Sequence, residues 1–192
     1  MRRGYKQTEI GLLPEDWEVV RLGDVLELLR NGLVFRQNKD KKGIPVTRIE
    51  TISEEKIDSQ KVGYIEGISE KEISEYRLQI GDILFSHINS IEHIGKTAIY
   101  NGEPPMLLHG MNLLLLRPKK SLVEPNYLLC QLRHLRAKGL FRNMSKKAVN
   151  QASINQLELG RVKLICPPLG EQKKIAEILS TVDKRLELLR KK

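Results

Sequence analysis

Two consecutive prolines, Pro167 and Pro168, stand between an apolar segment and the last stretch of the chain. Because proline fixes φ and lacks a backbone N–H, this pair ends a preceding strand and favours a stiff turn. Glu171 then lies in a first helical turn and basic residues end the chain, as the helix dipole favours. The sequence therefore predicts a C-terminal helix over 167–192. Its apolar edge consists of Ile175, Ile178, Leu179, Val182, Leu186 and Leu189, and it packs either on its own domain or on another chain.

The rest of the chain alternates between strand-like and helix-like patterns. A helix is predicted over 22–30, and a second over 125–138, where Pro125 suits the first turn and Gly139 suits the end. The segment 54–74 is polar and is expected to be irregular. Segments rich in isoleucine, leucine and valine predict strands over 17–21, 44–49, 79–87, 96–100, 111–117 and 161–166.

This order of elements predicts an α+β fold. We expect a twisted, mostly β domain over 1–166 with peripheral helices, followed by the protruding helix over 167–192. A chain of 192 residues with 40% hydrophobic side chains is long enough for one such domain plus an appendage.

The sequence also gives an expected location. No apolar run reaches the length of a membrane span, and Met1-Arg2-Arg3 is followed by polar residues, unlike a secretory signal. Cys130 and Cys166 lie on apolar segments, so we expect buried thiols in a reducing compartment. The expected location is the cytoplasm, without a membrane partner.

The basic residues are distributed unevenly. The net charge is +9, and the stretch from Pro104 to Leu157 holds a single acid, Glu124, against nine bases, which leaves +8. An ordinary solvated face is one explanation of such a stretch. Exclusion of acids over this length favours a polyanionic partner, and phosphate is the obvious one, because each neutralised phosphate releases condensed counterions. The nine bases are Arg117, Lys119, Lys120, Arg133, Arg136, Lys138, Arg142, Lys146 and Lys147.

Four sequence blocks in order resemble one protein family. Residues 167–179, Pro-Pro-Leu-Gly-Glu-Gln-Lys-Lys-Ile-Ala-Glu-Ile-Leu, are typical of the specificity subunits of type I restriction-modification systems, where this motif opens the conserved spacer helix. Residues 10–24 look like the entry into a target recognition domain of that family. Residues 81–98, with Gly-Asp-Ile-Leu-Phe-Ser and Ile-Gly-Lys-Thr-Ala, resemble its central strands, and 150–155 resemble its exit.

The resemblance implies a function and a set of partners. The implied protein is a specificity subunit that binds double-stranded DNA and docks a methyltransferase subunit and a restriction and translocase subunit, with adenine N6-methylation as the modification. Family members usually carry two recognition domains and two spacer helices, which pair antiparallel and set the distance between the domains. This chain has length for one of each. We therefore expect a half-subunit, or half of a longer one, that forms a homodimer through the terminal helix.

Motifs for catalysis are missing from the sequence. The segments 103–106 and 166–169 contain Pro-Pro but lack the amide and the aromatic residue of an adenine methylation loop, and no phosphate-binding loop is present. The four histidines have no spacing typical of a metal site or a catalytic triad. We therefore expect a non-catalytic protein without a cofactor or a metal. Two alternatives stay open: a nonspecific basic nucleic-acid adaptor, and a metal-dependent nuclease that uses Asp16 and the segment 54–56.

Side chains suited to DNA are concentrated in three segments. Arginine, lysine, asparagine, glutamine and serine contact base edges or phosphates, although a plain solvated loop is the alternative for each segment. We expect Asn89 and Gln37 to distinguish bases, since amides pair with adenine edges. The candidate residues are Arg36, Gln37, Asn38, Lys39, Lys41 and Lys42; Ser86, His87, Asn89, Ser90 and Lys96; and Arg142, Lys146, Lys147, Asn150 and Gln151.

Overall fold

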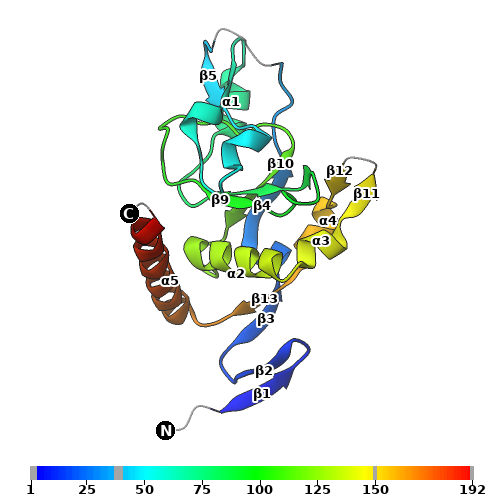
Figure 1. Ribbon diagram of the computed structural model, residues 1–192, viewed down its shortest axis with the longest axis vertical. Helices are drawn as coiled ribbons and strands as arrows, with labels where there is room; N and C mark the ends of the chain where they lie inside the picture. Colours follow the sequence, from blue (N-terminus) through cyan, green and yellow to red (C-terminus); the bar gives the residue numbers. More distant parts are fainter. Residues whose placement is uncertain (1–3, 37–40, 149–150, 191–192) are drawn as a thin grey trace.

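A four-stranded antiparallel sheet forms the centre of the molecule (Figure 1). The computed structural model describes residues 4–36, 41–148 and 151–190. In the sheet the strand order is β4 (Leu26–Asn31), β10 (Leu113–Pro118), β7 (Ile83–Ser86) and β9 (Thr97–Ile99). The strands predicted over 79–87, 96–100 and 111–117 are confirmed by β7, β9 and β10.

Both faces of this sheet are covered, which explains the unbroken leucine run in β10. Successive side chains of a strand point to opposite faces. Leu114 and Leu116 therefore belong to one core cluster and Leu113 and Leu115 to the other, and all four are almost fully buried.

Helix α2 (Pro125–Ala137) covers the first face and confirms the helix predicted over 125–138. Its C-terminal turn continues through Gly139, whose φ of 78° lies in the left-handed region that glycine tolerates, into α3 (Leu140–Met144). The ring of Phe141 from α3 packs edge-to-face on Phe85 of β7, with 4.9 Å between ring centroids. This contact joins α3 to the first core cluster, to which both rings belong.

A smaller lobe covers the second face. It contains β5 (Ile44–Val46) paired with β6 (Gly63–Ile65), the 3-10 turns Ile49–Ile52 and Ser59–Lys61, and α1 (Glu70–Tyr76). The strand predicted over 44–49 is confirmed but shorter. The prediction that 54–74 is irregular is wrong in part, because β6 and most of α1 lie within this segment.

Helix α1 begins with a capping box that the sequence contains. Ser69 accepts a hydrogen bond from the backbone of Glu72, and the Glu72 side chain accepts one from the backbone of Ser69. Arg30 of β4 lies 4.2 Å from the ring centroid of Tyr76 and binds Glu75 at 3.0 Å. These contacts fix α1 against the central sheet.

The helix predicted over 22–30 is wrong. Leu22–Val25 form a 3-10 turn, and the following residues form β4. Leu28 and Leu29 of this strand pair with Arg117 and Leu116 of β10. Strand β4 is the edge strand of a sheet that is covered on both faces. Its apolar residues therefore do not alternate strictly with polar ones, and their spacing imitates a helical period.

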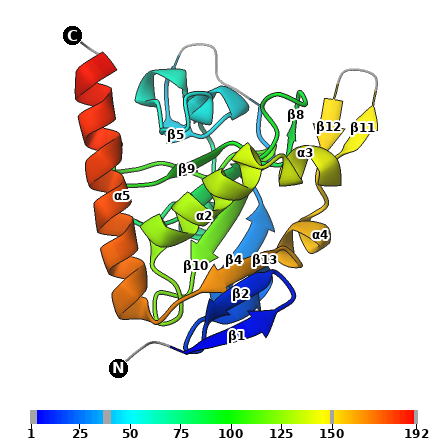
Figure 2. The ribbon, with the colours of Figure 1, turned by 60° about the horizontal axis from the view of Figure 1, so that its bottom comes forward.

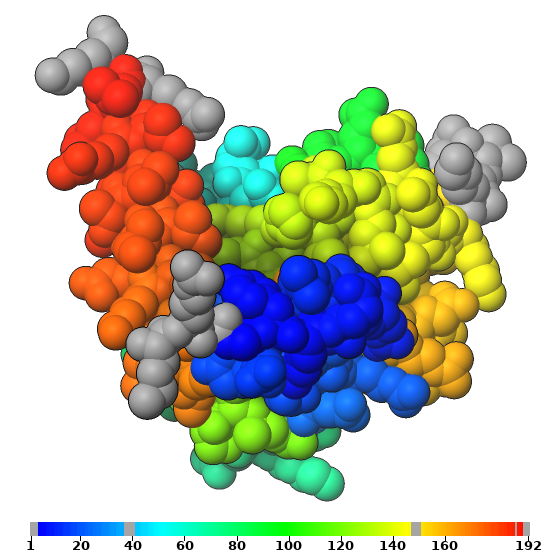
Figure 3. All heavy atoms as spheres, turned by 90° about the horizontal axis from the view of Figure 1, so that it is seen from below, coloured from blue at the N-terminus to red at the C-terminus, as the bar shows by residue number. Residues whose placement is uncertain are grey.

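The two ends of the domain meet in a separate two-stranded sheet. Strand β3 (Glu18–Arg21) pairs with β13 (Lys163–Cys166), so the strands predicted over 17–21 and 161–166 are confirmed. Before β3, the hairpin of β1 (Tyr5–Thr8) and β2 (Gly11–Pro14) lies beside the start of α5 (Leu169–Arg190) on the face shown in Figure 3.

The first turns of helix α5 pack on the domain. Gln172 and Ala176 are buried and Ile175 is half-buried, whereas every side chain described from Glu177 to Leu189 is exposed. Cys130 and Cys166 are half-buried rather than buried, and burial raises the pKa of both thiols. Within the described residues, no helix is long and apolar enough to cross a membrane.

Candidate nucleic-acid interface

A small three-stranded sheet unites two of the three predicted DNA-contacting segments. Strand β8 (Ile88–Asn89) pairs with β12 (Gln151–Ser153), which pairs with β11 (Lys146–Ala148). This β8–β12–β11 sheet lies on the opposite side of the domain from α5 in both views (Figures 1 and 2).

The pairing register separates the two faces of this sheet. Ala152 is only 2% exposed and lies opposite Asn89, so both are on the inner face. Lys146 lies opposite Ser153, and Gln151 is two residues away on the same, outer face. Lys146 and Gln151 are exposed. The outer face therefore presents a cation and an amide to solvent.

The amide of Asn89 is engaged inside the protein at both ends. Its Nδ2 donates to Oγ of Ser86 at 3.1 Å, and its Oδ1 accepts from the backbone N–H of Ser90 at 2.8 Å. The hydroxyl of Ser90 in turn lies 3.3 Å from Nδ1 of His93. These contacts connect the end of β7, strand β8 and the turn that follows it.

His87 is 7% exposed, and its carbonyl accepts a hydrogen bond from the backbone N–H of Ile154 at 2.8 Å. Burial lowers the pKa of His87 to about 4, so its imidazole is neutral at pH 7. A neutral, buried ring attracts no phosphate, and the geometry gives His87 a structural place behind the β8–β12–β11 sheet.

The remaining candidate cations differ in their surroundings. Lys96 donates to the carbonyl oxygen of Ser53 and is tied to the fold. Arg142 is exposed on α3, at a cavity of about 370 Å³ that Arg136 and Glu92 also line. Arg36, Lys41 and Lys42 are exposed beside the segment 37–40. Gln37, Asn38, Lys39 and Asn150 lie outside the described residues, and Lys147 is described by its backbone in β11 alone.

Several bases of the acid-poor stretch are bound within the fold, which the sequence reasoning missed. Arg117 makes two hydrogen bonds of 2.8 Å to the buried carboxylate of Asp82. The others donate to backbone carbonyl oxygens: Lys119 to Asp24 at 3.0 Å, Lys120 to Ile80 at 3.0 Å, Arg133 to Glu55 at 2.7 Å and Arg136 to Glu92 at 2.8 Å. These partners lie outside the stretch in sequence, so composition alone gave no signal of them.

Fewer bases of this stretch are therefore available to a partner than the sequence predicted. Four described bases between Pro104 and Leu157 have exposed side chains: Lys120, Lys138, Arg142 and Lys146. Lys120 donates to the carbonyl oxygen of Ile80, whereas Lys138 directly follows α2, Arg142 belongs to α3 and Lys146 to β11, on one flank of the domain (Figure 2).

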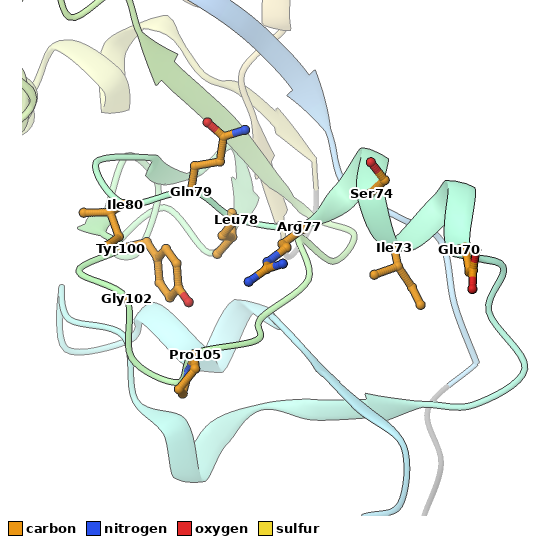
Figure 4. A pocket seen from close by; sticks show the side chains of 10 residues that line it. All are labelled: Glu70, Ile73, Ser74, Arg77, Leu78, Gln79, Ile80, Tyr100, Gly102 and Pro105. Carbon is orange, nitrogen blue, oxygen red and sulfur yellow. The ribbon is translucent and has the colours of Figure 1, made fainter.

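A cavity of about 680 Å³ lies on the smaller lobe, between α1 and the 100–105 loop. Figure 4 shows Arg77 extending toward the ring of Tyr100, with Glu70 at the far end. The phenol of Tyr100 donates to the carbonyl oxygen of Pro104 at 2.5 Å, and its raised pKa, caused first by burial, keeps it protonated. A carboxylate separated from a cation and a protonated phenol is not an acid–base pair for catalysis.

One residue of the segment that was named for a nuclease site takes part in an ion pair instead. Glu55 forms an ion pair with Arg136 at 3.3 Å. Within the part of the chain that the structure describes, no three histidine, cysteine, aspartate or glutamate side chains are grouped as a metal would require.

The comparison with protein families decides the class. The family model of the type I restriction modification DNA specificity domain matches residues 14–192. The chain belongs to this family. The resemblance of the four sequence blocks is thereby confirmed.

Two relatives give the extent of the similarity. The putative type I restriction enzyme MjaX specificity subunit of Methanocaldococcus jannaschii is 60% identical over 194 residues, which cover 97% of this chain and 46% of the relative. The type I restriction enzyme EcoKI specificity subunit of Escherichia coli is 29% identical over 161 residues, or 83% and 34% of the two chains. The chain thus spans less than half the length of these relatives.

Solved structures confirm the mixed α/β fold. The HsdS subunit of Thermoanaerobacter tengcongensis superposes with a TM-score of 0.68 at 21% identity, over 97% of this chain and 42% of that one. A chain from a study of complex assembly and conformational transition in the type I R-M system gives 0.71 at 23% identity, over 93% and 41%.

Proposed function

We propose that this chain is a non-catalytic DNA recognition unit of a type I restriction-modification system, and that its β8–β12–β11 sheet enters the major groove. Membership of the specificity family supports the first part. The exposed outer face of the sheet, with Lys146 and Gln151, supports the second, because a β-ribbon fits the major groove and an amide can pair with adenine. Lys138 and Arg142 on the same flank would contact phosphates.

The proposal extends to assembly. The domain over 1–166 would bind one DNA half-site and dock the methyltransferase and restriction subunits in the cytoplasm, with adenine N6-methylation as the outcome. Helix α5 would act as the spacer. Along its apolar edge, Ile175, Leu179, Val182, Leu186 and Leu189 alternate steps of four and three residues, the repeat of a coiled-coil seam.

Selection of bound duplexes from random DNA tests this function directly. A specificity unit returns a defined half-site motif at physiological salt. The alternative, a nonspecific basic adaptor, gives affinity that depends on salt and no enriched motif. Absence of any motif would contradict the proposal, and metal-dependent cleavage by the purified chain would favour the nuclease alternative.

Removing two bases from β11 should weaken DNA binding uniformly. We expect Lys146→Ala with Lys147→Ala to lower the salt dependence of log K by about one unit, because the strand register places Lys146 on the outer face and pairs Lys147 with Ala152 of the inner face, and each phosphate contact contributes about 0.9. Fluorescence anisotropy titrations at several salt concentrations measure this slope. Lys71→Ala with Lys173→Ala removes the same charge from exposed positions on α1 and α5 and should leave the slope unchanged. An equal slope in both double variants would exclude the β8–β12–β11 sheet as the phosphate-contacting surface.

Removing the amide from β12 should change specificity more than affinity. Gln151→Ala is expected to reduce discrimination at one base position by about 1–3 kcal/mol, the value of a good bidentate contact. Asn89→Ala is expected to relax the same preference through loss of the turn that its amide holds between Ser86 and Ser90. Selection from random DNA compares these variants with Gln60→Ala, an exposed glutamine of the smaller lobe. The same motif from all three would mean that neither amide contributes to recognition.

A further inference from the structure

Gln172 is a fully buried polar residue at the base of α5, with 0% of its side chain exposed. Its Oε1 accepts the backbone N–H of Glu124 at 2.9 Å. Its Nε2 lies 2.7 Å from the carbonyl oxygen of Pro167, 3.1 Å from that of Leu122 and 3.4 Å from Sγ of Cys166. Both ends of the amide are therefore satisfied, as burial of a polar group requires.

The partners of Gln172 come from two parts of the domain, the connection between β10 and α2 and the end of β13 with the following Pro167. Glu124 is the N-cap of α2, Leu122 lies in the loop after β10, and Cys166 ends β13. One side chain thus connects the first turn of α5 to each of these elements. Beside it, Nε1 of Trp17 donates to Oε2 of Glu171 at 3.1 Å.

Beyond these contacts the helix continues with exposed side chains. The 22 residues of α5 are about 33 Å long at 1.5 Å per residue, and its described side chains are exposed from Glu177 to Leu189. A tilt of about 10° at the base displaces the far end by about 6 Å, more than the base-pair step of about 3.4 Å. The angle at the base therefore determines where a partner on the far part of the helix lies.

We propose that Gln172 is a positioning residue that sets the angle at which α5 leaves the domain, and thereby the number of base pairs between the two half-sites of the DNA target. The statement about the angle stands on the contacts of Gln172 alone. The statement about the target rests on the proposed function. Hydrogen bonds are directional, so an amide with fixed partners on both ends restricts the helix more than an apolar side chain of the same size.

The angle is measured by residual dipolar couplings of the backbone amides, without DNA. Gln172→Met keeps the length of the side chain and removes its polar atoms, and Lys173→Met is the matched control at the exposed neighbour. In Gln172→Met we expect the couplings to give a different orientation of α5 relative to the sheet β4–β10–β7–β9. In Lys173→Met we expect the same orientation as in the wild type. The couplings within the sheet report whether the domain is folded, and Gln172→Asn, which keeps an amide but shortens its reach, replaces Gln172→Met if that variant unfolds. An unchanged orientation of α5 in the folded variant overturns the proposal.

The spacing is measured by selection from DNA with randomised half-sites and randomised separation. The wild type and Lys173→Met should enrich one separation. Gln172→Met should enrich the same half-site motif at separations that differ by one or more base pairs. A merely destabilised protein would lose affinity without changing the separation, and an unchanged separation overturns the link to the target. If the wild type enriches no motif, the proposed function fails, while the dipolar couplings still decide the role of Gln172.

Discussion

Acidification from pH 7 to pH 5 should lower the free energy of unfolding by about 4 kcal/mol through two buried histidines, at about 2 kcal/mol each. Burial lowers the pKa of His87 and of His109 to about 4, from an ordinary value of 6.5. For His109 the positive charges of Arg30 and Arg117 contribute to this lowering, after burial, because they oppose a further positive charge. An imidazole that resists protonation only in the folded state makes the folded state less stable in acid.

The direction of the effect follows from the lowered pKa values. Both histidines are neutral in the folded and unfolded states above pH 6.5, so their contribution is fully present there. As the pH falls from 6.5 towards 4, the unfolded chain binds protons that the folded protein does not, and stability is lost. Nε2 of His109 lies 3.0 Å from the carbonyl oxygen of Leu113 and so carries the hydrogen, while its Nδ1 is buried without a described partner. Protonation would place a charge at that buried nitrogen.

Urea denaturation between pH 5 and pH 8 measures this effect. His109→Gln retains a donor for the carbonyl of Leu113 and does not titrate, so its stability should fall by about 2 kcal/mol less than that of the wild type over this range. His134→Gln changes an exposed histidine and should follow the wild type. Equal pH dependence in all three proteins would show that His109 is not the responsible group.

The sequence predicted the elements whose signal is local. Helix α2 has a proline at its start, a glycine after its end and an apolar face in between, and the leucine run of β10 is too short and too apolar for anything but a buried strand. The segment 22–30 was predicted as a helix because Leu22, Val25, Leu26 and Leu29 have helical spacing, but it forms a 3-10 turn and most of β4. Its true conformation depends on β10, more than eighty residues away along the chain.

The candidate site was predictable in part for the same reason. Composition identified the acid-poor stretch, and the segments around Asn89 and Gln151 do meet in one sheet. Composition could not separate bases that face solvent from those, such as Arg117, whose partner Asp82 lies elsewhere in the sequence. The polar contacts of Gln172 could not be predicted from the sequence either, because its partners become neighbours only after β13 and α2 have packed.

Val182→Glu should abolish pairing of two chains while leaving the domain folded. Val182 is 47% exposed and lies beyond the part of α5 that contacts the domain, so a carboxylate there stays in water in the single chain. In a helix pair built on the apolar edge, the same carboxylate would be buried without a partner, at a cost of several kcal/mol. Ser180→Glu adds the same charge to an exposed position of α5 outside the edge and is the matched control.

Light scattering gives the result directly. The wild type and Ser180→Glu should have twice the mass of the 22.0 kDa chain, and Val182→Glu should have the mass of one. A two-fold pair presents two identical recognition domains in opposite orientations, so the selected DNA should be an interrupted palindrome. Val182→Glu should then select the half-site alone, because the domain keeps its β8–β12–β11 sheet but loses its partner. If the wild type and Val182→Glu have the same mass, or if the variant unfolds, the apolar edge has another function and the palindrome is not expected.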